Sequence, residues 1–161
     1  VPTPPPAAMP APPRLARFLA PEIQEGLVTV TDEADRSTVR LRGDSFFASG
    51  SAEPMARVLP VLGRIGQALA EVQGEVLITG HSDNVPIRSL RFPSNWHLST
   101  ARAEAVRAAL SPLVAPERLR AEGRADAEPV ASNGTAEGRA QNRRVDIVLF
   151  TGAGALSAGA R

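Results

Sequence analysis

The chain has 161 residues, with 18 basic and 17 acidic side chains and a formal net charge of +1. This length suits one folded domain with unstructured ends, and the near-zero net charge argues against non-specific binding of nucleic acid. The sequence contains no Cys, which excludes disulfide bonds, thiol catalysis and cysteine-based metal sites.

The two ends of the chain have compositions that do not build a core. Pro and Ala dominate residues 1–13, which predicts a disordered tether in an extended conformation. Gly and Ala dominate residues 151–161, which predicts a disordered tail. We therefore expect the folded domain to span residues 14–150, and no part of the chain has the roughly 18 consecutive apolar residues of a membrane span.

The first half of the domain is predicted to contain a helix, a hairpin and a longer helix. A short helix is expected over Arg14–Gln24, before two β-rich runs, Leu27–Thr31 and Thr38–Arg42, that flank a polar turn. Apolar residues then recur at three- and four-residue spacing through Glu53–Val72. This spacing predicts an amphipathic helix with one face toward the core.

The second half alternates strands and helices. A β-rich strand is expected at Glu75–Gly80, followed by a polar loop up to His97 and a helix over Thr100–Leu110 with Ser99 as its N-cap. The remaining elements are expected to be, in order, a strand over Arg118–Gly123, a helix over Ala136–Asn142 and a strand over Val145–Phe150. This alternation predicts an α/β (α+β) sandwich, with the helices packed on one sheet.

A weak internal repeat places two carboxylates at equivalent positions. Gly80–Pro86 and Gly123–Pro129 share the pattern Gly-x-x-Asp-x-x-Pro, which puts Asp83 and Asp126 just after two strands. If those strands run parallel, both residues leave the same edge of the sheet, where α/β folds usually bind ligands. A loop carboxylate that accepts hydrogen bonds from nearby backbone is the alternative for Asp83.

Arg102 is the second candidate binding residue. With Ser99 as N-cap, Arg102 would lie in the first helical turn, where the helix dipole disfavours a cation by roughly 0.3–1 kcal/mol. A bound anion held by Arg102 and the free amides of the helix start would compensate, and so would an ion pair with Asp83 or another carboxylate. An acidic loop beside this cation suits a ligand with an ammonium and a carboxylate, such as an amino-acid head group.

Three segments carry a resemblance to a known family. Gly80–Asn84, Asn95–Ala103 and Gly138–Ile147 resemble the OmpA-like C-terminal family of peptidoglycan-binding domains, and the resemblance extends over about Val39–Phe150. It implies a βαβαβ domain with a mixed sheet and helices on one face. It also implies a non-enzymatic role without cofactor or metal, with peptidoglycan as the partner.

The resemblance assigns binding residues by position. In the family, the Asp of the first segment and the Arg of the Leu-Ser-x-x-Arg segment grip the diaminopimelate residue of the stem peptide, and these correspond to Asp83 and Arg102. Second-rank candidates are Ser82, where the family commonly has Thr, and Asn84, Asn142 and Arg143. Arg144 is expected to pair structurally.

Segment 85–96 resembles two inner-membrane subgroups of the family, the anchors of type VI secretion systems and those of flagellar stators. The segments Phe18–Val28 and Arg42–Ala52 favour the secretion subgroup. This resemblance implies a periplasmic domain of a Gram-negative inner-membrane protein, with a membrane segment before Val1. Other secretion membrane-complex proteins and a second copy of the chain are the further expected partners.

Two rival functions compete with wall binding. A metal-dependent hydrolase could use His81, Asp83 and His97, but no ligand spacing, nucleophile motif or phosphate-binding loop supports it. The second rival is a protein-docking module that uses the Pro-rich tether or the long loop. Trp96 and Phe92 could form an exposed recognition surface or could pack that loop onto the domain.

Overall fold

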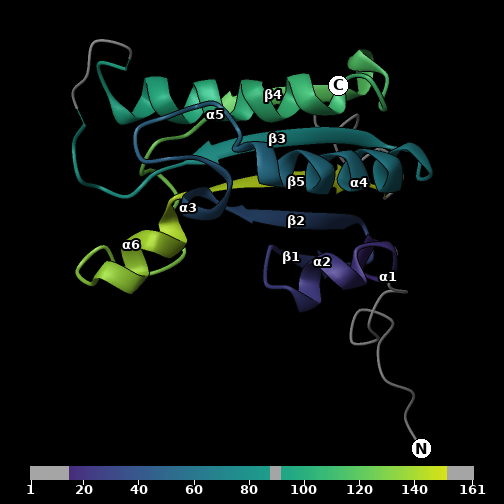
Figure 1. The fold of residues 1–161 in the computed structure, drawn as a ribbon, viewed down its shortest axis with the longest axis horizontal. Helices are drawn as coiled ribbons and strands as arrows, with labels where there is room; N and C mark the ends of the chain where they lie inside the picture. Colours follow the sequence, from purple (N-terminus) through teal and green to yellow (C-terminus); the bar gives the residue numbers. More distant parts are fainter. Residues whose placement is uncertain (1–14, 88–91, 152–161) are drawn as a thin grey trace, which may run out of the picture.

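The structure is a computed structural model, and it describes residues 15–87 and 92–151 as a five-stranded sheet with helices packed against it (Figure 1). The strands are β1 (Val28–Asp32), β2 (Arg36–Arg42), β3 (Glu75–His81), β4 (Leu119–Gly123) and β5 (Arg144–Phe150). The helices are α1 (Leu15–Phe18), α2 (Ala20–Gln24), α3 (Gly43–Phe46), α4 (Leu59–Ala70), α5 (Asn95–Leu110) and α6 (Ala136–Asn142). Two 3₁₀ turns, Ala56–Val58 and Pro116–Arg118, precede α4 and β4.

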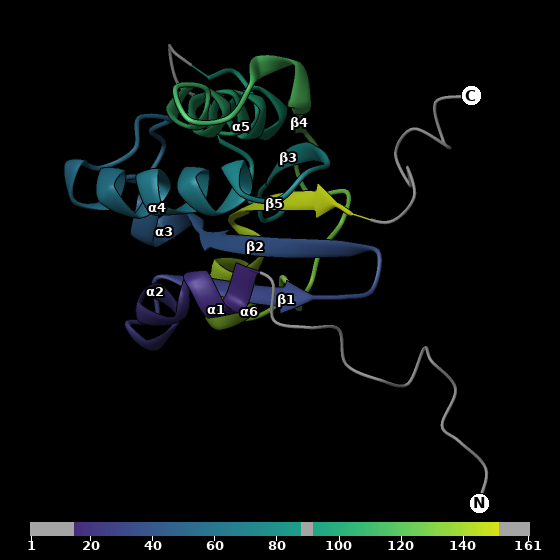
Figure 2. The same cartoon turned by 90° about the vertical axis from the view of Figure 1, so that its right-hand side faces the viewer.

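The sheet is mixed, as expected. Its strand order is β1-β2-β5-β3-β4, with β3 and β4 parallel and the other neighbours antiparallel. The parallel pair is joined through α5, which is the usual crossover for two parallel strands. The expected α/β fold with a mixed sheet is confirmed, and α1, α2, α4 and α5 lie on one face of it (Figure 2).

The core lies between this face and the helices. Alternate residues of β2 and β5, such as Val39, Leu41 and Ile147, are fully buried toward the helices, while Arg40 and Asp146 pair on the other face. This alternation follows from the two-residue period of a strand. Apolar residues of α4 and α5 complete the core: Leu62, Ile65, Leu69, Val106 and Leu110.

Prolines account for two corrections to the predicted helices. The helix expected over Arg14–Gln24 is two short helices, because Pro21 lies in the first turn of α2 and has no N–H to continue the preceding one. The helix expected over Glu53–Val72 is shorter, since Pro60 lies in the first turn of α4 and Pro54 forms an isolated β-bridge with Phe47.

The start of α5 is a further correction, and it changes the argument about Arg102. The N-cap is Ser94, whose side chain accepts a hydrogen bond from the backbone N–H of His97. Ser99 lies inside the helix, where its hydroxyl donates to the carbonyl of Trp96. Arg102 is therefore two turns past the helix start, and the expected anion site on free helix amides does not form around it.

The other elements lie close to the ranges predicted from the sequence. The hairpin is present with a shorter turn, because β2 begins at Arg36 and Asp32 pairs with Ser37. β4 and β5 match to within one residue and α6 matches at both ends. The predicted tether over 1–13, the tail after Thr151 and part of the 85–96 segment lie outside the described residues.

Two glycines bring α5 close to the sheet. Gly80 and Gly123 are paired neighbours at the ends of β3 and β4. A Cβ on Gly80 would collide with the backbone of Ser99, and one on Gly123 would collide with Thr100. The absence of these side chains therefore sets how closely the helix packs over the strand ends.

Candidate functional site

β2 and β3 end at the edge of the sheet where β5 begins. The register aligns Arg144, at the start of β5, with Arg42 at the end of β2 and with His81 at the end of β3. Residues just beyond these ends therefore meet, although they are far apart in sequence. Asp44 follows β2, Asp83 follows β3 and Arg143 precedes β5.

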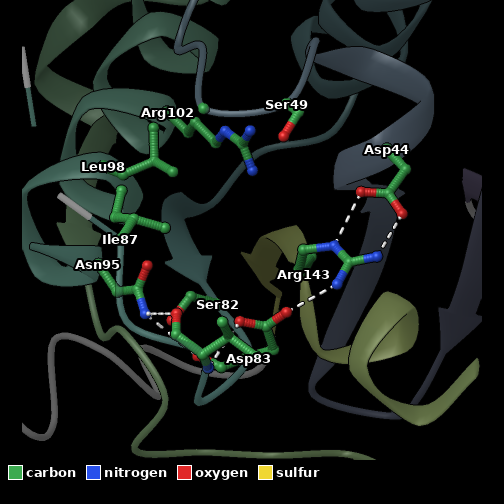
Figure 3. A pocket seen from close by; sticks show the side chains of 11 residues that line it. Asp44, Ser49, Ser82, Asp83, Ile87, Asn95, Leu98, Arg102 and Arg143 are labelled. Atoms are coloured by element: carbon green, nitrogen blue, oxygen red, sulfur yellow. Dashed lines mark hydrogen bonds and ion pairs between the residues drawn. The ribbon is translucent and has the colours of Figure 1, made fainter. Parts of the chain in front are cut away.

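These residues line a pocket of roughly 470 Å³ (Figure 3). Asp44, Arg143 and Asp83 lie together in it, whereas Arg102 lies apart from them, beside apolar side chains of α5 and of the loop after β3. The lining residues are Asp44, Ser49, Gly50, Ser82, Asp83, Val85, Ile87, Asn95, Leu98, Arg102 and Arg143. The structure thus brings the two principal candidates, Asp83 and Arg102, into one pocket.

Asp83 is a buried residue of the pocket lining, and both of its carboxylate oxygens are hydrogen-bonded. Its Oδ2 accepts a hydrogen bond from Arg143 Nη1 at 2.7 Å, and its Oδ1 accepts one from the backbone N–H of Val85 at 3.1 Å. Asn95 donates to the carbonyls of Asp83 and Val85 and so ties the start of α5 to this loop. The local backbone bond expected for a loop carboxylate therefore exists beside an ion pair.

Arg102 reaches the pocket from α5 and is 6% exposed. Its Nε donates to the Ser51 carbonyl at 2.8 Å and its Nη2 to the Ala48 carbonyl at 3.2 Å, while the guanidinium lies over the ring of Phe47. Burial lowers the pKa of Arg102, because a desolvated cation is less favourable. Among the described residues Arg102 has no carboxylate within ion-pair distance, so the expected alternative of a pair with Asp83 does not occur.

The second-rank candidates separate into two groups. Ser82 and Arg143 line the pocket, and the Ser82 hydroxyl donates to the Asp83 carbonyl. Asn84 is exposed and does not line it.

Asn142 is fully buried away from the pocket. Its side-chain oxygen accepts from the N–H groups of Val130 and Ala131, and its amide nitrogen donates to Ala131 and Asn133. These bonds hold the loop before α6 and leave the side chain no free group for a ligand.

Arg144 pairs structurally, as the sequence predicted. It is 4% exposed, and its Nε donates to Asp146 at 3.1 Å. Its other nitrogens donate to the carbonyls of Asn142 and Glu128. Arg143 and Arg144 are thus adjacent in sequence but have different partners, Arg143 in the pocket and Arg144 at Asp146.

Asp44 is the site residue that sequence reasoning missed. Both of its carboxylate oxygens accept hydrogen bonds from Arg143, at 2.9 and 2.7 Å, and this bonding lowers the pKa of Asp44. Gly43 allows the contact, because its N–H donates to the Arg143 carbonyl and a Cβ there would lie 2.7 Å from that oxygen. Only the pairing of β2 with β5 could have revealed it.

The two histidines lie in different environments. His81 is buried, with Nε2 2.9 Å from the Thr79 hydroxyl, whereas His97 is exposed and its Nδ1 contacts the Ser94 hydroxyl. Within 15–87 and 92–151 no cluster of three or more His, Cys, Asp or Glu side chains could hold a metal ion. The geometry gives no support to the hydrolase hypothesis.

Stability is expected to fall between pH 6.5 and 4 because of His81. Burial, together with the positive charge of Arg144, lowers its pKa from 6.5 to about 4. In this window the unfolded chain binds a proton that the folded chain does not, so the free energy of unfolding decreases as the pH falls, by about 2–3 kcal/mol at pH 4.5.

Urea unfolding at pH 7 and pH 4.5 measures this loss, with the His81→Gln variant as the comparison. Gln does not titrate, so the variant should lose less stability than wild type over the same interval. An equal loss in the two proteins would contradict the assignment of the effect to His81.

Trp96 and Asp126 lie outside the pocket. The Trp96 ring is 55% exposed and meets the His97 ring edge-on, with 5.6 Å between the ring centroids. Trp96 therefore does not pack into the core, whereas Phe92 is partly buried. The parallel pairing of β3 and β4 does place Asp83 and Asp126 at one edge, but Asp126 is exposed and is not a lining residue.

The fold and the pocket define a small α/β domain with acidic and basic side chains gathered in one pocket. The sequence matches the OmpA family over residues 46–143, which is more than half of the chain. The chain therefore belongs to the OmpA family, whose domains bind peptidoglycan and are not catalytic.

Three individual proteins illustrate the similarity. The solved structure of the cell wall anchor of the T6SS, the type VI secretion system, from Pseudomonas aeruginosa is 55% identical, with a TM-score of 0.83, covering 86% of this chain and 98% of that one. A MotB-like protein from Desulfovibrio vulgaris is 26% identical, with a TM-score of 0.78, covering 85% and 86%. Motility protein B of Bacillus subtilis is 36% identical over 115 residues, 70% of this chain and 44% of its own.

The chain spans about half the length of the curated relatives it matches. Within the described residues no helix has the length and apolar character needed to cross a membrane.

Proposed function

We propose that this domain anchors a type VI secretion membrane complex to the cell wall by holding the diaminopimelate residue of the peptidoglycan stem peptide. In this proposal Arg102 binds the free carboxylate of that residue and Asp83 binds its free ammonium. The domain would work in the periplasm of a Gram-negative bacterium, as part of an inner-membrane protein of the TssL type.

The observation that carries the proposal is that Arg102 is buried without a carboxylate partner among the described residues. A buried guanidinium is costly unless charged or polar groups compensate it, and among the described residues Arg102 contacts two carbonyls but no carboxylate. Its Nη1 makes no hydrogen bond to any described residue and belongs to a side chain that lines the pocket. A ligand carboxylate would supply the missing charge through a charge-assisted bond.

Asp83 supplies the opposite charge in the same pocket. Its two hydrogen bonds to protein donors fix the carboxylate and leave lone pairs for an incoming ammonium. Between the charges, Val85, Ile87 and Leu98 offer apolar surface to an aliphatic chain. A free amino-acid head group on a methylene chain, as diaminopimelate presents, matches this arrangement.

The secretion context rests on similarity to the T6SS anchor, which exceeds that to the MotB-like and motility proteins in identity. The flagellar stator remains the second candidate, because Motility protein B matches over 70% of this chain. Both contexts use the same proposed ligand, so the test of the ligand and the test of the context are separate.

The Asp83→Asn variant tests whether the domain binds diaminopimelate through this pocket. The substitution keeps the size and one acceptor oxygen but removes the charge, and we expect binding to diaminopimelate-type sacculi to weaken at least about tenfold. Co-sedimentation of the purified domain with sacculi measures the change. Asp126→Asn is the matched control, since that carboxylate follows the neighbouring strand but lies outside the pocket.

A wild-type domain that stays in the supernatant would overturn the anchor and favour protein docking. The same Asp83→Asn variant, placed in the full-length protein in its own bacterium, also separates the two contexts. We expect it to reduce type VI effector export and to leave swimming unchanged, and the reverse pattern would assign the domain to a stator.

A further inference from the structure

One wall of the pocket is a chain of three charged side chains from three parts of the fold. Arg143 donates two parallel hydrogen bonds to Asp44, from Nε at 2.9 Å and Nη2 at 2.7 Å. Its remaining terminal nitrogen, Nη1, donates to Asp83 at 2.7 Å (Figure 3). The guanidinium is thus used on both sides, with the bidentate pair directed away from Asp83.

Because Arg143 bonds both Asp44 and Asp83, these three residues set the charge of one part of the pocket. With both carboxylates ionised, one guanidinium stands against two negative groups, so the Asp44–Arg143–Asp83 chain carries one net negative charge. Arg102 carries the balancing positive charge elsewhere in the same pocket. Without Asp44, Arg143 would neutralise Asp83 alone, and the pocket would become net positive.

We propose that Asp44 is a positioning residue, which holds Arg143 through a bidentate pair and thereby keeps Asp83 negative toward a ligand ammonium. This inference rests on the proposed function, since it concerns the ammonium side of the same pocket. Asp44 makes the pocket selective for a zwitterionic head group over one whose amine is blocked.

The bonding around Arg143 supports this assignment. Both carboxylates raise the pKa of Arg143, and the hydrogen bonds that Arg143 donates to Asp44 are the larger cause. The geometry also explains why Arg143 does not swing fully onto Asp83, because fork-shaped pairing to one carboxylate fixes the plane of the guanidinium. The Asp44 side chain is 52% exposed, so as a surface pair it contributes little to stability.

Asp44→Asn tests the proposal with two ligands measured by calorimetry. One is a soluble muropeptide with a free diaminopimelate head group, and the other is the same muropeptide with that amine acetylated. The variant should bind the first ligand about tenfold more weakly, as expected for one charge interaction near a surface. The variant should bind the acetylated ligand at least as tightly as wild type does, because the pocket is then net positive and this ligand keeps only its carboxylate. Asp44→Glu should restore binding of the free ligand.

Asp35→Asn is the matched control, because Asp35 also faces both Nε and Nη2 of one arginine, Arg36, and is 51% exposed. Equal affinity of wild type and Asp44→Asn for the free ligand would overturn the proposal. So would an equal loss for both ligands, which is the signature of a merely structural role. A wild type that binds neither ligand would overturn the proposed function and this inference with it.

Discussion

Replacing Arg102 with Leu is expected to abolish retention of the domain on diaminopimelate-type sacculi. Loss of one member of a buried, hydrogen-bonded charge pair costs about 2–5 kcal/mol, which corresponds to a thirtyfold or larger loss of affinity. The loss should exceed that of Asp83→Asn, because Arg102 is the one group in the pocket that supplies an unpaired positive charge among the described residues. Co-sedimentation over a range of sacculus concentrations measures it.

The control for Arg102 must separate ligand binding from loop support, since Arg102 also holds the carbonyls of Ala48 and Ser51. Arg107 provides it on the same helix, where its Nε and Nη2 donate to the carbonyls of Leu119 and Pro116. Arg107→Leu should bind sacculi like wild type. Retained binding by a folded Arg102→Leu domain would refute the assignment of the carboxylate site.

The largest effect on stability is expected at Gly80. A Cβ at this position would meet the backbone carbonyl of Ser99, and backbone in a packed helix cannot move aside as a flexible side chain can. Gly80→Ala should therefore lower the free energy of unfolding by about 3 kcal/mol, and Gly80→Val by more. Urea denaturation followed by circular dichroism measures both.

Gly63 is the control for this prediction. It lies inside α4, and an added Cβ there would have no neighbour within 4 Å. Gly63→Ala should stabilise the domain by about 0.5–1 kcal/mol, because Ala is the better helix former. A Gly80→Ala protein as stable as wild type would show that α5 can shift from the sheet without cost.

Local patterns predicted the strands well, because those features depend on neighbouring residues. The alternation at Val39 and Leu41 and the run at Val145–Phe150 are enough to define buried strand faces. The predicted start of α5 was wrong, because neighbouring residues alone did not determine it. Ser94 and Ser99 are both good N-caps by composition, and the choice depended on how the loop after β3 returns to the sheet.

The site was only partly predictable. Asp83 and Arg102 were candidates from their positions after a strand and near a helix start, the resemblance assigned them to the ligand, and the geometry then placed them in one pocket. Asp44 could not be predicted, since its contact with Arg143 joins residues 99 positions apart. Asn142, a second-rank candidate, is directed into the loop before α6, and a motif does not show which way a side chain points at a helix end.

The position of β5 in the sheet bears on how the domain matures. β5 is the last strand along the described chain, yet it lies between β2 and β3 and supplies the pairing partner of both. As the polypeptide emerges from its N-terminal side, these two earlier strands expose unpaired edges until residues 144–150 arrive. Arg143 directly precedes these residues, so the pocket is complete only after the sheet has closed.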